Sequence, residues 1–301
     1  MKLPIWATAA HPIARRELNL WRKAGLSLWW LWIIFLLPPL CGAFSLLFSV
    51  LSAAFSFSVT SVNAFNDLPP EFWASIFGGT ALAALWGMQA FLGWGIGIFA
   101  VIGSAGVIAR EREAQIWPLL RLTAFDVPDI VSAKITAVLR GLARPVLAVL
   151  ALRVASVVGS VLFAYLLAAL TGSSGNDQQL QWITINAFLF LPVFLLTVLS
   201  GTIYTCAIST FVSAIVRTPA VALAMSFLTL LLLWLFVFLP VQFYVYAIAD
   251  QLLQTAVPYP YNFQLLIPAI FAWFLLPAIM QVGLAALAFG LSFERAGRPE
   301  E

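Results

Sequence analysis

The residues best suited to polar recognition in this chain are concentrated in residues 108–134. Eight of these 27 residues are charged, whereas only 9% of the 301-residue chain is charged. Glutamate and arginine alternate at residues 110–113, which suits a self-paired, solvated helix end. A connection of this length is also far longer than a simple turn between helices requires. The stretch therefore indicates a function beyond reversing the direction of the chain.

Candidate residues for catalysis or metal binding are scarce. His11 is the only histidine, so a metal cluster and a catalytic triad both lack a residue they need. None of Lys2, Lys23 and Lys134 follows a glycine or precedes a serine or threonine, so the chain has no P-loop for ATP. We therefore expect no catalytic residue, no bound metal or cofactor, and an energy source outside this chain.

The charged stretch lies between long apolar segments that must be helices. The mean hydropathy is +1.02, and soluble proteins carry charge on about a quarter of their residues. Each segment exceeds the roughly 20 residues that cross a bilayer, and backbone groups in lipid are satisfied within helices. The predicted fold class is an all-α polytopic membrane protein, a single transmembrane domain over residues 1–301, with spans at 28–58, 76–109, 141–171, 183–214, 218–247 and 264–293.

Lysine and arginine residues indicate how the chain is oriented. Five precede the first span and six lie around the connection between the second and third spans, whereas residues 59–75, 172–182 and 248–263 contain none. Positive residues remain on the cytoplasmic side. We therefore expect a multi-pass protein of the cell (inner) membrane with both termini and the charged stretch in the cytoplasm. The half-apolar connection 248–263 should be an outer re-entrant or interfacial segment.

Residues 12–25 are predicted to form an amphipathic helix on the inner surface of the membrane. One arc of this helix is basic and the other is apolar, which suits the lipid bilayer as a partner. The residues concerned are Arg15, Arg16, Leu18 and Trp21. Glu17 departs from this pattern and leaves two interpretations, an ion pair with a basic group elsewhere or snorkelling to water. Without a soluble basic module, nucleic acid is not an expected partner.

Within the charged stretch, the sequence predicts a stalk followed by a short helix. Residues 111–113 should continue the second span past the headgroups, and a break is expected at Ala114–Gln115. A new helix should then cover residues 117–123, with Pro118 in its first turn. Its apolar side chains, Leu119, Leu120 and Leu122, must meet either a partner chain or the headgroup region.

These motifs resemble those of the permeases of type-2 ATP-binding-cassette (ABC) exporters. That family carries E-R-E-x-G-T-x-x-x-L-L-x-T-P-x-x-x-x-x-I-V-x-G-K after the second of six spans, and N-P-x-x-x-R-E-L near its start. The matching residues here are Glu111-Arg112-Glu113, Leu119-Leu120, Thr123, Ile130-Val131 and Lys134, together with Pro12 and Arg16-Glu17-Leu18. This chain departs from the family's pattern at Gln115-Ile116, Ala124 and Ala133, where the family has Gly-Thr, Pro and Gly.

The resemblance implies a transmembrane permease subunit that exports a substrate using ATP hydrolysed by a separate nucleotide-binding subunit. Residues 110–135 would be the coupling segment, and its short helix would dock on that ATPase, which would bind ATP and Mg. A second permease chain, identical or different, would complete the transporter. The implied coupling residues are Glu111, Arg112, Glu113, Trp117, Leu119, Leu120, Leu122, Thr123 and Lys134.

Five polar residues within the spans are candidates to line a conduit: Arg153, Ser200, Thr202, Tyr204 and Thr205. Hydroxyl groups in membrane helices more often bond to their own backbone or to a neighbouring helix. Arg153 is the only charge deep inside a span, since Arg144 lies only three residues after the start of the third span. Arg153 should either face the protein interior or snorkel to the inner headgroups. Cys41 and Cys206 both lie within spans and are predicted to be packed thiols.

A second function stays open at this point. The chain could instead be a non-transporting membrane scaffold subunit of a larger complex that retains the permease fold. The two functions differ in their partners, because only the exporter requires an ATPase.

Overall fold

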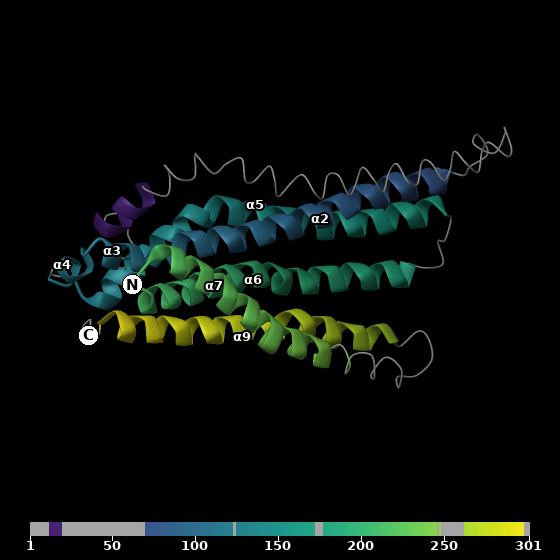
Figure 1. Ribbon diagram of the computed structural model, residues 1–301. Helices are drawn as coiled ribbons and strands as arrows, with labels where there is room; N and C mark the ends of the chain where they lie inside the picture. The colour runs from purple at the N-terminus through teal and green to yellow at the C-terminus, as the bar shows by residue number, and fades with distance from the viewer. Residues whose placement is uncertain are drawn as a thin grey trace, which may run out of the picture. The chain divides into compact units, whose positions relative to one another are not determined.

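The protein is helical throughout the part of the chain that the structure describes (Figure 1). The structure is a computed structural model that describes residues 12–19, 70–122, 125–171, 177–245, 247 and 262–297. Residues 12–19 form a helix, and no strand occurs within these ranges. The other elements are α2 (Pro70–Ala105), α3 (Ala109–Glu113), α4 (Trp117–Arg121), α5 (Val127–Leu170), α6 (Asp177–Ile215), α7 (Pro219–Leu233), the π-helical turn η3 (Trp234–Phe238) and α9 (Asn262–Gly297).

Five helical segments are long and apolar enough to cross a bilayer. They are Ile76–Glu113, Val127–Leu170, Thr184–Ile215, Pro219–Val245 and Phe274–Gly297. These segments match the second to sixth predicted spans, which confirms the all-α, multi-pass membrane class. The predicted first span, 28–58, lies outside the described residues. So does the outer connection 248–263, apart from its last two residues, which begin α9.

The helical segment Ile76–Glu113 reaches residues 111–113, as predicted, but a turn interrupts it where the sequence indicated a continuous helix. α2 ends at Ala105, a turn occupies residues 106–108, and α3 begins at Ala109. Ser213, near the end of α6, stabilises this break. Its Oγ accepts hydrogen bonds from the backbone N–H groups of Ile108 and Ala109, both at 3.0 Å. A side chain from another helix therefore caps N–H groups at the start of α3.

The helix that contains the predicted third span begins at Val127, before residue 141, where the apolar pattern begins. The backbone N–H of Ile130 donates to the carbonyl oxygen of Asp126, and Pro128 occupies the first turn, where its missing N–H has no cost. At 1.5 Å per residue, the 44 residues of α5 are about 66 Å long, which exceeds the roughly 30 Å hydrocarbon core. Lys134 therefore lies near the start of a helix that is longer than a bilayer crossing requires.

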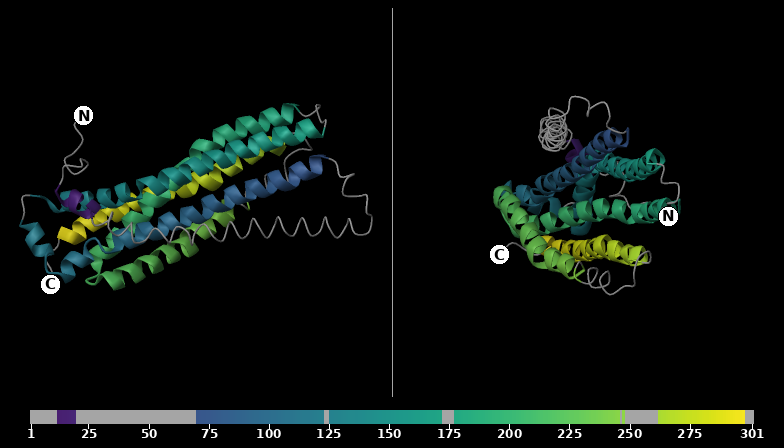
Figure 2. Two further views of the ribbon diagram at one scale, coloured as in Figure 1. Left: turned by 90° about the horizontal axis from the view of Figure 1, so that it is seen from above. Right: turned by 90° about the vertical axis from the view of Figure 1, so that its right-hand side faces the viewer.

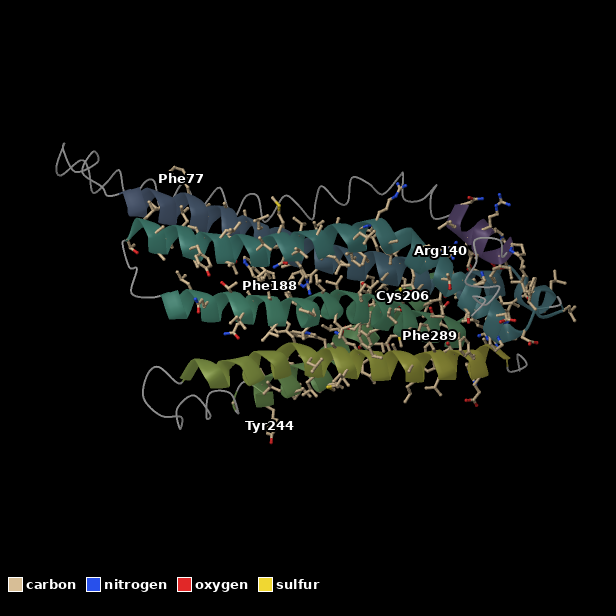
Figure 3. All side chains as sticks on the ribbon, turned by 180° about the vertical axis from the view of Figure 1, so that it is seen from behind. Phe77, Arg140, Phe188, Cys206, Tyr244 and Phe289 are labelled. Carbon is tan, nitrogen blue, oxygen red and sulfur yellow. The ribbon has the colours of Figure 1, made fainter. Side chains whose placement is uncertain are left out.

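The chain forms two compact units, each with its own contacts. The first comprises Met1–Leu28, Ile96–Val146 and Leu196–Glu301. Its apolar core joins α6, η3 and α9, and α7 crosses α9 in this unit (Figures 1 and 2). The buried residues of this core are Tyr204, Ala207, Ile208, Phe238, Ala285 and Ala288. In Figure 3, Cys206 lies within the helices of this unit, whereas Tyr244 points away from them. Cys206 is a buried free thiol, as predicted.

The second unit comprises Trp29–Gly95 and Leu147–Leu195. Here α2 and α5 are in close contact, because a Cβ atom on Gly78 would collide with the ring of Phe163. About two helical turns after Gly78, Trp86 Nε1 of α2 donates to Ser160 Oγ of α5 at 3.3 Å. Close approach at a glycine commonly holds helices together in lipid. Hydrogen bonds between the side chains of neighbouring helices have the same effect.

We expect Ser213→Ala to lower the free energy of unfolding by about 1–3 kcal/mol, because two buried N–H groups lose their acceptor. Thermal unfolding in mild detergent would measure the change. The matched control is Ser226→Ala, because Ser226 is equally buried but donates only to Ala222 O within its own helix, at 2.7 Å. Equal stability of the two variants would contradict a capping role for Ser213.

Candidate functional site

A buried cluster of charges lies where three separate parts of the chain meet. Lys134 Nζ donates to Glu17 Oε1 at 2.9 Å and to Glu111 Oε1 at 3.0 Å. The Lys134 side chain is only 1% exposed. Arg16 Nη1 lies 3.8 Å from the same Glu111 oxygen. One ammonium therefore joins the helix of residues 12–19, α3 and the first part of α5, and all of these belong to the first compact unit. We call Glu17, Glu111 and Lys134 the buried triad.

The pattern of helix 12–19 explains how Glu17 reaches this position. Ala14 and Glu17 are buried on one side, three residues apart, whereas Arg15, Arg16 and Asn19 are exposed on the other. Glu17 therefore faces the protein, and of its two interpretations the ion pair is confirmed. The predicted remainder of this helix, including Trp21, lies outside the described residues.

Residues 111–113 do not form the self-paired, solvated stalk that the sequence predicted. Glu111 is buried against Lys134, and Arg112 Nη1 donates to the carbonyl oxygen of Ala214 at 2.6 Å. Only Glu113 is exposed. The charges of this stretch pair with distant elements because α3 packs against α5 and the end of α6 instead of projecting into water.

The predicted break at Ala114–Gln115 is confirmed, and its geometry explains how α3 ends. Gln115 has φ of 57°, the left-handed conformation. Ile116 N–H donates to Glu111 O at 2.8 Å and Gln115 N–H to Arg112 O at 3.0 Å, which together form a Schellman motif. The resembled family has glycine at the position of Gln115, and glycine suits this conformation best. The turn is therefore present here although its glycine is not.

α4 is the predicted short helix and ends at Arg121, two residues earlier than expected. Trp117 anchors it, since its side chain is 1% exposed and its Nε1 donates to Ala296 O near the end of α9 at 3.3 Å. Leu119 is 64% exposed and Leu122 is 83% exposed, whereas Leu120 is half-buried. Thr123 lies outside the described residues. α4 thus keeps one aromatic side inside the protein and presents two leucines outside it.

Helix 12–19, α3, α4 and the C-terminal end of α9 gather at one end of the first unit (Figures 1 and 2). Figure 3 shows many side-chain nitrogen and oxygen atoms at this end, where Arg140 of α5 also lies. Sequence reasoning missed Ser213 and the Ala296 carbonyl, because a serine in an apolar helix and a backbone oxygen carry no recognisable pattern.

The candidate conduit hydroxyls of α6 mostly bond within their own helix. Thr202 donates to Val198 O and Thr205 donates to Gly201 O. Ser200 is different, because its Oγ donates to Gln281 Oε1 of α9 at 2.7 Å. Sequence reasoning overlooked Gln281, although an amide within an apolar span is itself a signal. These bonds hold helices together, and a conduit role stays a prediction.

Two further conduit candidates lie in different units. Tyr204, in the first unit, packs edge-on against Phe238 with ring centroids 5.6 Å apart, and its hydroxyl has no hydrogen-bond partner within the described ranges. Arg153, in the second unit, donates to Phe194 O and lies over the Phe194 ring, 4.1 Å from its centroid. Arg153 therefore reaches α6, which favours the interior-facing interpretation over snorkelling.

The arrangement suits mechanical linkage. Two carboxylates and an ammonium at hydrogen-bond distance hold elements in register, and in the described part of the chain no three His, Cys, Asp or Glu side chains could share a metal ion. Three of the motif fragments that carry the family resemblance each contribute one residue to the triad: Arg16-Glu17-Leu18 contributes Glu17, Glu111-Arg112-Glu113 contributes Glu111, and the third is Lys134. No protein-family model, curated protein or solved structure matches the chain.

Lys134→Met should lower the free energy of unfolding by about 3–5 kcal/mol, because it leaves two buried carboxylates without their shared cation. Replacing all three residues, as Glu17→Gln, Glu111→Gln and Lys134→Met, should restore most of this loss. Thermal unfolding of the inserted chain would measure both variants, with the exposed Arg144→Gln of α5 as the control, expected within about 0.5 kcal/mol of wild type. A stable single variant would show that the triad holds nothing together.

Gln115→Gly should stabilise the α3–α4 turn by up to about 1 kcal/mol, because glycine adopts the left-handed conformation without a Cβ clash. Gln115→Val should destabilise it, since β-branched residues suit this conformation least. Hydrogen exchange across α3 and α4 would report both effects. Ala114→Gly is the control, since Ala114 has φ of −77° and gains nothing from glycine. An identical effect at both positions would mean that the left-handed conformation is not the cause.

Proposed function

We propose that this chain is the transmembrane permease subunit of an ABC exporter, driven by ATP hydrolysis in a separate nucleotide-binding subunit. The observation that carries the proposal is the buried triad. The residues that resemble the family's motif are far apart in the sequence, yet four of them lie together. Lys134 is hydrogen-bonded to Glu17 and Glu111, and Arg16 lies 3.8 Å from Glu111. A chance likeness of sequence gives no reason for its pieces to meet in space.

The surface of α4 supports the docking part of the proposal. Burial of an exposed leucine side chain is favourable by about 1.5–3 kcal/mol. Contact of Leu119 and Leu122 with the surface of a partner would therefore stabilise a complex. The anchored Trp117 and the turn at Gln115 give α4 a defined position from which it can receive a force. A rigid anchor beside an exposed apolar face suits a helix that docks in the groove of a partner.

The linkage that follows is mechanical. ATP binding in the partner would move α4, and the movement would pass through α3 to α5 and helix 12–19 at the buried triad. It would also reach α6 through Ser213 and Arg112, and α9 through Trp117. An ATPase that prefers one position of α4 would thereby shift the equilibrium between inward-open and outward-open forms.

The pair Leu119→Asp and Leu122→Asp should leave insertion and thermal stability unchanged but reduce co-purification of the ATPase at least about tenfold, because two carboxylates cannot be buried in an apolar groove. Affinity purification from native membranes in mild detergent, with identification of bound proteins, would measure the loss. Pro128→Asp is the control, because it adds a carboxylate on the exposed first turn of α5.

Retention of a bound ATPase by the leucine variant would remove α4 from the interface. If the wild-type chain itself co-purifies with no ATPase but with other membrane proteins, the scaffold function replaces the exporter.

A further inference from the structure

The exposed face of helix 12–19 carries positive charge alone. Arg15 and Arg16 are exposed, with 57% of the Arg16 side chain accessible. The only acidic residue of this helix, Glu17, faces the opposite side and is bound to Lys134. Because its carboxylate is directed inward, the helix presents two cations and the neutral Asn19 on its outer side.

Much of the apolar face of the same helix is already occupied by protein. Ala14 is buried, and Ile13 and Leu18 are half-buried. An amphipathic helix binds a membrane through inserted apolar area and through attraction of its cations to anionic lipids. With part of its apolar area used against the protein, this helix depends more on its charge.

Arg16 belongs to this exposed face and also lies next to the buried triad. Its Nη1 lies 3.8 Å from Glu111 Oε1, longer than a normal hydrogen bond and close enough for electrostatic attraction. Glu111 Oε2 is buried and has no hydrogen-bond partner among residues that the structure describes. The balance of charge around Glu111 therefore depends on where the Arg16 guanidinium goes.

We propose that Arg15 and Arg16 bind the phosphate of anionic phospholipids in the inner leaflet, and that Arg16 transmits this binding to α3 by leaving Glu111. A lipid phosphate forms a bidentate, charge-assisted pair with a guanidinium, which a contact at 3.8 Å does not match. When Arg16 moves to the lipid, Glu111 shares only the Lys134 ammonium with Glu17. The excess negative charge of the triad is then no longer balanced by Arg16, and its hold on α3 weakens.

The proposal uses the orientation predicted from the lysine and arginine distribution and does not require transport activity. Each arginine near an anionic surface contributes about a fivefold gain in affinity. Arg15→Gln with Arg16→Gln should therefore lower the affinity for phosphatidylglycerol about 25-fold. Asn19→Gln, a neutral change on the same exposed face, should leave it unchanged.

The test uses the full chain in nanodiscs of phosphatidylcholine with increasing fractions of phosphatidylglycerol. Native mass spectrometry counts the retained anionic lipid, and hydrogen exchange reports α3 and α4. In the wild type, phosphatidylglycerol should be retained and exchange in α3 should rise. Arg16→Ala should remove the rise in exchange while Arg15 keeps part of the binding. Soluble phosphate at millimolar concentration should not displace the lipid.

Three outcomes would overturn the proposal. Equal retention of phosphatidylglycerol by the double arginine variant would exclude these residues as the lipid site. Retention without any change of exchange in α3 would exclude transmission through Glu111. Displacement by inorganic phosphate would assign the arginines to a soluble anion instead of a lipid. Because the chain is studied alone, none of these outcomes depends on whether an ATPase binds to α4.

Discussion

A single buried ammonium group decides how one end of this protein is assembled. Lys134 is 1% exposed and its nitrogen lies 2.9 Å from Glu17 and 3.0 Å from Glu111. An unpaired charge in such surroundings would cost several kcal/mol, so the Lys134 ammonium must be paired with carboxylates at its buried position in α5. The two that it has come from a helix near the N-terminus and from the segment after the second span. Elements more than a hundred residues apart in the chain are thereby held at one place.

The other contacts at this end fit the same constraint. Because Glu111 must face Lys134, α3 cannot continue straight from α2, and the chain breaks at residues 106–108. Ser213 satisfies the N–H groups that the break leaves open, and Arg112 reaches a carbonyl at the end of α6. The Schellman turn then directs α4 so that Trp117 is buried and Leu119 is exposed. α4 therefore has a fixed position and an apolar outer face, which suits a helix that transmits a movement from a partner to the membrane helices.

The lengths of the apolar segments predicted most of the membrane architecture, because segments of this length satisfy their backbone hydrogen bonds in lipid by forming helices. Five of the six predicted spans correspond to helices, and the break after Glu113 and the short helix with Pro118 were also predictable. The ion pair of Glu17 was one of two interpretations. An acidic residue within the apolar arc of a helix indicates that it has a basic partner, but the sequence does not show which residue that is. Glu111 was wrongly predicted to be solvated. Alternating charges suggest pairing within one helix, and the sequence does not show that α3 packs against α5.

The remaining features could not be read from periodicity. Ser213 caps a distant helix, yet in sequence it looks like every other hydroxyl of α6. The π-helical turn at Trp234–Phe238 places Phe238 against Tyr204 of α6, a contact that the sequence pattern does not indicate. Gln115 takes a left-handed conformation that its type does not favour, because hydrogen bonds on both sides of the turn hold it there. In each case, tertiary contacts override local preference.

We propose that α4 contacts an ATPase, and photocrosslinking tests this contact most directly. A photoreactive amino acid at position 119, irradiated in native membranes, would form a covalent bond with whatever touches the exposed face of α4. Mass spectrometry of the adduct would identify the neighbour. We expect one soluble nucleotide-binding protein, attached through a peptide that is not part of its ATP site. Adducts with phospholipid alone, or with a second membrane protein and no ATPase, would contradict it.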